Sequence, residues 1–396
     1  MRKAKRSCIL LGLLLLIPIM GCWDRKEIED VGIVLGIGFD KPAKGITEQG
    51  EKGTIRGKHP IMMIHHIAIP EQFSTSGGGK SQKNYINLIS KGDLVFENIR
   101  KLSTRTARYP SYEHLREVVI SEDVARTIDF NNIINFLMRN SETRRSIRVM
   151  IAKGKARDVF EKEGSVRNPA LELRELAENY HNSFSMSPEM KMGDMSENIT
   201  GKISFVIQRV DSSKKETKIA GAAVIKGKTA KMIGWLGEEE TAGLNWLKGQ
   251  KKAAGIMEGV ESKSGEMIVY EVRSMTSKIK PLVKGSKISF TVEIKTEGKL
   301  REDWVDPGNA FDPNFVNRAE QAIEISIKKA AERALTKTQK KFKVDVVGFG
   351  KKLSIKYPKT WKKVKKDWDE SFSEIPIEVK VKTEIQEFGT RGTKKA

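Results

Sequence analysis

Residues 31–39, Val-Gly-Ile-Val-Leu-Gly-Ile-Gly-Phe, form an apolar, β-branched run without a charged side chain. Such a run predicts a buried strand. Three further strand-like runs follow, at residues 61–69, 115–120 and 148–152. Segments with helical spacing or helix-start residues accompany them, at residues 93–102, 133–139 and 168–180. The alternation predicts a first unit in which strands and helices are mixed.

The second half of the chain is richer in strands. Strand-like runs occur at residues 203–210, 219–226, 267–273 and 287–295, with a helix expected at 238–248. Asp312-Pro313 supplies a cap and a first-turn proline for a long amphipathic helix that extends to Leu335. The remaining segments predict a strand at 344–349, a helix at 358–372 and a strictly alternating strand at 375–385.

These elements predict an α+β fold with three mixed α/β domains, whose largely antiparallel or mixed sheets are packed by helices. Residues 183–200 are rich in Ser, Met and Gly without a clear period, and they predict a linker. We expect an N-terminal α+β domain at 22–192, a middle β-rich domain at 193–300 and a C-terminal α+β domain with the long helix at 301–396. A cleaved leader, residues 1–21, precedes them.

The leader has the features of a lipoprotein signal peptide. Four basic residues lie within the first six positions, an apolar run extends from Ile9 to Met20, and Gly21-Cys22 follows. The run is shorter than the roughly 20 residues that span a bilayer. Lipoprotein processing would cut after Gly21 and attach diacylglycerol to the sulfur of Cys22, and two acyl chains anchor a protein stably. An ordinary secretory signal with an incidental cysteine is the alternative.

Composition narrows the function further. The two cysteines are Cys8, inside the leader, and Cys22, so the mature chain has no thiol for a disulfide, metal site or nucleophile. The formal net charge is +21. On an exported chain this charge favours anionic lipid or an acidic partner over nucleic acid.

Residues 337–366 carry the most unusual charge pattern, with twelve lysines and Asp345 as the one acid. This segment indicates either a solvated face on a generally basic protein or a basic face that binds anionic lipid or an acidic loop of a partner. The candidate face is represented by six lysines: Lys351, Lys352, Lys362, Lys363, Lys365 and Lys366.

Catalytic and metal-binding patterns are weak. His65 and His66 are adjacent on an expected strand, so their side chains point to opposite faces and cannot clamp one metal ion. Glu238, Glu239 and Glu240 fit a helix start, where carboxylates face the positive end of the helix dipole. The methionines of 186–195 suit adaptable packing between domains better than Cu(I) binding. We therefore expect no enzyme activity, metal or cofactor.

Several motifs together resemble a known family. Trp23-Asp24-Arg25-Lys26-Glu27-Ile28 directly follows the lipid-attachment motif, and other pieces recur in order. These pieces are His114–Glu122, Phe136–Asn140, Ile151–Ala156, Gly221–Lys226, Glu240–Leu247 and Gln339–Gly350, followed by Trp361, Trp368 and Phe372. The chain resembles the Ger(x)C family, the lipoprotein C subunits of the nutrient receptors that trigger germination of bacterial endospores.

The resemblance covers essentially the whole mature chain. It implies a three-domain lipoprotein at the outer face of the cell or inner spore membrane, assembled with a membrane A subunit and a transporter-like B subunit. The family has no established catalytic residues to carry over, and only the lipid-bearing position transfers, onto Cys22. A solute-binding lipoprotein of a transporter and a cell-wall-active lipoprotein are the alternative functions.

Overall fold

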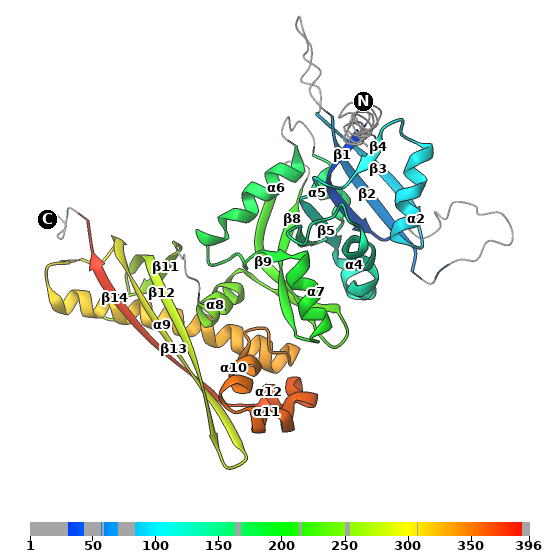
Figure 1. Ribbon diagram of the computed structural model, residues 1–396. Coiled ribbons are helices and arrows are strands. Elements are labelled where there is room, and N and C mark those ends of the chain that lie inside the picture. The colour runs from blue at the N-terminus through cyan, green and yellow to red at the C-terminus, as the bar shows by residue number, and fades with distance from the viewer. Residues whose placement is uncertain are drawn as a thin grey trace, which may run out of the picture.

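The computed structural model describes residues 31–42, 57, 59–69, 84–162, 168–213, 216–249, 254–306 and 308–389. The leader, Cys22 and the Trp23–Ile28 motif lie outside the described residues. Within them, the chain forms two β-sheets, one of ten strands and one of four, with helices packed on both (Figure 1).

The ten-stranded sheet has the order β10-β9-β8-β6-β5-β1-β2-β3, with β4 beside β1 and β7 beside β6. Its strands are β1 (Val31–Asp40), β2 (Ile61–Ala68), β3 (Tyr85–Gly92), β4 (Tyr109–Ser111), β5 (Glu117–Ser121), β6 (Arg148–Ala152), β7 (Met190–Lys191), β8 (Phe205–Ser212), β9 (Thr217–Lys226) and β10 (Lys231–Leu236). The central strands β1, β5, β6 and β8 pair in parallel, and antiparallel strands flank them on both sides. All five residues of β5 are buried, because both faces of the sheet are covered there.

Helices cover the two faces of this sheet. The helices on one face are α2 (Val95–Arg100), α3 (Glu122–Thr127), α4 (Phe130–Arg139) and α7 (Met192–Thr200), whose apolar residues share one core with the sheet. A short 3₁₀ segment, η3 (Lys101–Thr104), follows α2. On the other face lie α5 (Ala156–Phe160) and α6 (Pro169–Glu178), which is followed by η4 (Asn179–His181). The caps expected from sequence form at α6, where the Asn168 side chain accepts the Ala170 N–H and Pro169 opens the helix.

The four-stranded sheet has the order β11-β12-β13-β14. Its strands are β11 (Ile256–Val260), β12 (Met267–Lys284), β13 (Lys287–Asp303) and β14 (Ile377–Glu387). The long helix α9 (Pro313–Thr336) lies along this sheet, and η5 (Lys337–Phe342), a π-helical segment, continues it. Four short elements complete the unit: α10 (Phe349–Lys356), α11 (Pro358–Val364), η6 (Lys365–Asp367) and α12 (Trp368–Glu374).

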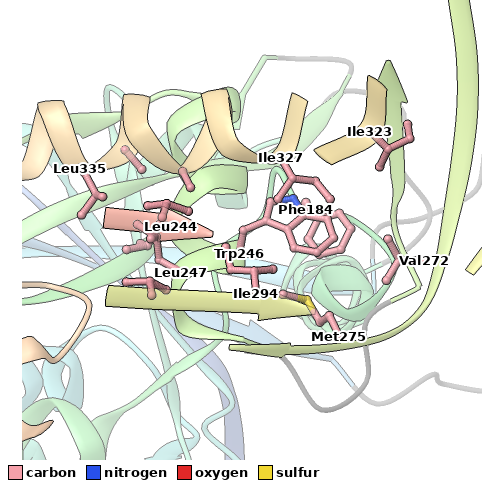
Figure 2. Packing of buried hydrophobic residues seen from close by; sticks show 14 of the residues in the cluster. Phe184, Leu244, Trp246, Leu247, Val272, Met275, Ile294, Ile323, Ile327 and Leu335 are labelled. Atoms are coloured by element: carbon pink, nitrogen blue, oxygen red, sulfur yellow. The ribbon is translucent and has the colours of Figure 1, made fainter. Parts of the chain in front are cut away.

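Helix α8 (Glu238–Lys248) joins the two sheets. Its Trp246 is fully buried and stacks on Phe184, with ring centroids 4.5 Å apart, and both side chains belong to the core of the four-stranded unit (Figure 2). The Asn245 side chain donates to the carbonyl oxygens of Phe184 and Met186 at 2.8 and 2.7 Å. Because this core also takes in Val206 and Val224, the apolar interior is continuous from one sheet to the other.

The mixed α+β architecture expected from sequence is confirmed. Two local predictions are wrong. Residues 183–200 are not a linker throughout, since β7 and α7 form there and Met192 and Met195 are buried in the core below α7. Residues 344–349 form no strand, because the Asp345 carboxylate draws the following backbone N–H groups into a turn.

The division into three domains stays a prediction. Strands β8, β9 and β10, which lie beyond the expected boundary at residue 193, are hydrogen-bonded into the ten-stranded sheet. Strands β11, β12, β13 and β14 share one sheet across the expected boundary at residue 300.

Candidate functional site: the basic helical face

The lysine-rich segment begins at the end of α9. The Asp312 side chain caps this helix by accepting the Asn314 N–H at 2.9 Å, as the sequence pattern predicts. After α9 and η5 the chain reverses at Lys343, which adopts the left-handed conformation with φ of 53°. The reversal carries the polypeptide into α10 and, from there, through α11, η6 and α12.

Asp345 organises the turn before α10. Its side chain accepts hydrogen bonds from the backbone N–H groups of Val347, Gly348 and Gly350, at 3.2, 2.7 and 2.7 Å. A fourth bond comes from the indole Nε1–H of Trp368 at 3.0 Å. The residue is 6% exposed. Asp345, the one acid of the lysine-rich segment, is therefore buried and hydrogen-bonded within the fold. It forms no ion pair with the exposed lysines of this segment.

Aromatic packing fixes the short helices against one another. Trp361 of α11 and Trp368 of α12 meet edge to face with ring centroids 5.2 Å apart. Gly350 of α10 lies against both rings, and a Cβ there would be 2.8 Å from Trp368 Nε1 and 3.0 Å from Trp361 Cη2. Phe349 and Phe372 are fully buried beneath them and connect the helices to Phe290 of β13. The lysines thus project from a packed scaffold.

All six lysines of the candidate face are exposed: Lys351, Lys352, Lys362, Lys363, Lys365 and Lys366. They lie on α10, α11 and η6, and within the part of the chain that the structure describes none of them forms an ion pair. Two lysines earlier in the segment do have acidic partners, because Lys337 pairs with Glu240 at 2.7 Å and Lys340 with Glu374 at 3.3 Å. The basic face therefore carries exposed positive charge that no ion pair offsets, with Asp367 of η6 as an exposed acid beside it. Ile355 of α10 lies at the same face and is 70% exposed.

The histidines point to opposite faces of β2, as expected. The His65 ring lies between Ser90 and Tyr112, with nitrogen–oxygen distances of 3.1 and 3.2 Å. The His66 ring lies between the side-chain oxygens of Asn87 and Asn168, at 2.7 and 2.8 Å. Burial lowers the pKa of both, that of His65 to about 3. Among the described residues no group of three or more His, Cys, Asp or Glu side chains is placed to hold a metal ion.

The methionines in residues 186–195 take structural positions. Met186 is buried in the core near α5 and α6, whereas Met192 and Met195 belong to the core on the opposite face of the sheet. Their side chains thus pack on opposite faces of the ten-stranded sheet.

Sequence reasoning missed a buried ionic cluster. Glu117 of β5 is fully buried and its carboxylate lies 3.2 Å from the Arg148 guanidinium of β6, which also contacts Glu178 and Glu189. Burial raises the pKa of Glu117 to about 8, against the opposing attraction of Arg148. No sequence pattern marks this pairing, because it depends on the register that sets Glu117 opposite Arg148 in neighbouring parallel strands.

Comparison with known proteins gives a consistent result. The family profile described as "Spore germination protein N-terminal domain" matches residues 24–212, and that described as "Spore germination B3/ GerAC like, C-terminal" matches residues 220–389. Spore germination protein YndF of Bacillus subtilis (strain 168) is 36% identical over 397 residues, with 98% of each chain covered. Spore germination protein A3 of the same organism is 30% identical, covering 99% of this chain and all of that protein.

A solved structure also matches. The crystal structure of the GerBC protein covers 91% of this chain and 100% of its own, with a TM-score of 0.59 and 24% sequence identity, which shows a shared fold. Together these matches define the class as spore germination proteins. The chain belongs to the Ger(x)C family, so the family expected from the sequence motifs is confirmed.

Proposed function

We propose that this chain is the lipid-anchored C subunit of a spore germinant receptor and acts by assembly with membrane A and B subunits. The observation that carries the proposal is similarity along nearly the whole chain to spore germination proteins. Both family profiles contribute, and they extend from residue 24 to residue 389 with a short interval between them. The Gly21-Cys22 motif ends one residue before the matched region, which begins at Asp24.

Membrane attachment is assigned to diacylglycerol on Cys22, at the outer face of the inner spore membrane. Within the described ranges no helix is both long enough and apolar enough to cross a bilayer. The nine peptide steps from Cys22 to Val31 span at most about 30 Å when fully extended. The lipid would therefore keep the start of β1 close to the membrane and raise the effective concentration of this subunit near its partners.

An assembly role also fits the architecture better than the alternatives. A transporter's solute-binding lipoprotein with two similar lobes would show two related sheets. Here a ten-stranded mixed sheet is joined to a four-stranded one through a continuous core. A wall-cleaving function requires convergent catalytic groups. The buried glutamate of the ten-stranded sheet, Glu117, is instead committed to Arg148.

We propose that the basic face binds an acidic segment of a receptor partner. None of its six lysines forms an ion pair among the described residues, although Asp367 lies beside Lys366 in η6, and an acidic partner would relieve the repulsion between these lysines. Figure 1 places α11 and β1 at opposite ends of the molecule, so the face lies away from the strand nearest the lipid anchor. This placement favours a protein partner over the lipid surface that holds Cys22.

Affinity purification of the tagged chain from detergent-solubilised spore membranes tests the assembly. We expect the membrane A and B subunits to be recovered in constant ratio to this chain. Recovery of this chain without either subunit, after mild cross-linking in intact spores, would contradict the proposal.

Charge reversal tests the basic face separately. Lys362→Glu, Lys363→Glu and Lys366→Glu together should reduce recovery of the partner subunits, with a stronger effect at low salt. The control carries the same charge change on exposed lysines elsewhere: Lys155→Glu, Lys202→Glu and Lys278→Glu. Loss of binding to liposomes with anionic lipid, with the partners still recovered, would reassign the face to the membrane. If both triple variants reduced recovery of the partner subunits equally, the basic face would be a solvated surface without a binding role.

A further inference from the structure

A pocket of about 280 Å³ opens on the N-terminal unit, away from the basic face. Its walls come from α2, η3, β4, the end of α4 and the loop that follows α4. Nothing in the assembly role described above requires this pocket, and the inference drawn from it does not depend on that role.

One wall of the pocket is aromatic. Phe96 of α2 stacks on Phe136 of α4 with ring centroids 5.2 Å apart and an angle of 28° between the planes. Phe96 is nevertheless 47% exposed, and Tyr109 of β4, which also lines the pocket, is equally exposed. Apolar ring surface left in water favours a ligand that covers it. A planar, apolar body is the shape that stacks on such a wall.

Two arginines give the pocket its charge. The Arg100 guanidinium lies over the Phe96 ring at 5.0 Å, and Arg139 lines the pocket from the last turn of α4. Both side chains are exposed, and neither has an ion-pair partner among the residues that the structure describes. Glu142, the acid of the pocket, accepts the Tyr112 backbone N–H at 3.0 Å and so is partly engaged in the fold. The balance of charge in the pocket is positive.

We infer that this pocket binds a small organic anion with a planar apolar body, such as an aromatic carboxylate. The ring would lie on Phe96 and Phe136, and the carboxylate would accept hydrogen bonds from the guanidinium groups of Arg100 and Arg139. Guanidinium groups suit this task because their fork of N–H donors matches a carboxylate. A cavity with apolar walls and a few converging polar groups is the usual form of a small-molecule site.

Isothermal titration calorimetry of the full-length lipidated chain in detergent micelles, with phenylacetate as the ligand, tests this inference. We expect a Kd of about 1 mM or lower, which ligands of this size commonly reach. Acetate, which lacks the ring, and benzylamine, which reverses the charge, should bind at least about tenfold more weakly. Absence of phenylacetate binding would overturn the inference, as would equal binding of benzylamine.

Variants locate the binding. Arg100→Gln with Arg139→Gln should weaken phenylacetate binding by about tenfold or more, because charge-assisted hydrogen bonds are lost. Phe96→Ala should weaken it independently. Arg144→Gln, an exposed arginine just outside the pocket, is the matched control and should leave the affinity unchanged. Equal affinity of all variants would show that the ligand enters micelles or another surface and would refute the site.

Discussion

The substitution Gly243→Ala in α8 is the most direct test of the packing between α8 and α9, which connects the two sheets. A Cβ at this position would lie 1.9 Å from the carbonyl oxygen of Ala330 and 2.5 Å from its carbonyl carbon, both backbone atoms of α9. No side-chain rotation relieves a contact with backbone, so Gly243→Ala must push α8 and α9 apart. The displacement would loosen the core around Trp246 that connects the two sheets.

The size of the effect follows from two opposing terms. Overpacking in a close-packed interior costs about 1–3 kcal/mol, whereas replacing glycine by alanine within a helix contributes about 1 kcal/mol of stability. The contact is short enough that we place the cost at the upper end, and we expect a net loss of about 2 kcal/mol. In scanning calorimetry this corresponds to a fall in Tm of roughly 2–4 °C for a chain of this size.

A control on the same helix separates overpacking from a general effect of substitution. Glu239→Ala removes an exposed ion pair with Arg333 of α9. Such pairs contribute at most about 1 kcal/mol, so its Tm should change little. A Gly243→Ala protein that melts at or above the wild-type temperature would show that α8 and α9 do not cross as closely as described, and the reasoning would fail.

Two further predictions concern buried carboxylates. Asp345→Ala leaves four N–H donors without their acceptor, two of them buried, and should destabilise the C-terminal unit by about 2–5 kcal/mol. Calorimetry of the exposed control Asp367→Ala should show almost no change in stability. Equal destabilisation by the two substitutions would argue against the capping role of Asp345. Glu117 has a folded-state pKa raised to about 8, so the folded protein holds this proton more tightly than the unfolded chain. This tighter proton binding contributes to the free energy of unfolding; the contribution is fully present below about pH 4.5 and is lost as pH rises towards 8. Glu117→Gln should therefore gain Tm relative to wild type between pH 5 and pH 8, and a constant difference across this range would contradict the burial argument.

Much of the fold could be predicted from local sequence. The apolar run at 31–39 becomes β1, and the Asp312-Pro313 pair caps α9 as expected. The alternation at 375–385 becomes β14, where Val379 is buried and its neighbours Glu378 and Lys380 are exposed. These features are local, since periodicity and caps act within a few residues.

The errors have a common cause in long-range contacts. Residues 192–200 lack a convincing helical pattern, yet Met192 and Met195 are buried against a sheet formed by distant strands. The apolar residues 344–349 suggest a strand, but Asp345 turns the chain and receives a bond from Trp368, 23 residues later. The sheet that unites β8, β9 and β10 with β1 is likewise set by pairing that no local window contains.

The candidate sites divide in the same way. The lysines of the basic face could be found from composition, and the structure adds that Asp345 is buried beneath them. The pocket could not be predicted from the sequence. Its residues Phe96, Phe136, Arg100 and Arg139 come from separate helices that only the fold brings together.

Intact and peptide mass spectrometry of the native chain from spore membranes tests the central claim, attachment through the lipid on Cys22, most directly. The account predicts a mature chain that begins at Cys22, carries the added mass of thioether-linked diacylglycerol and sediments with the membrane. A Cys22→Ala chain should be released from it. A wild-type amino terminus without lipid, recovered in the soluble fraction, would contradict the account.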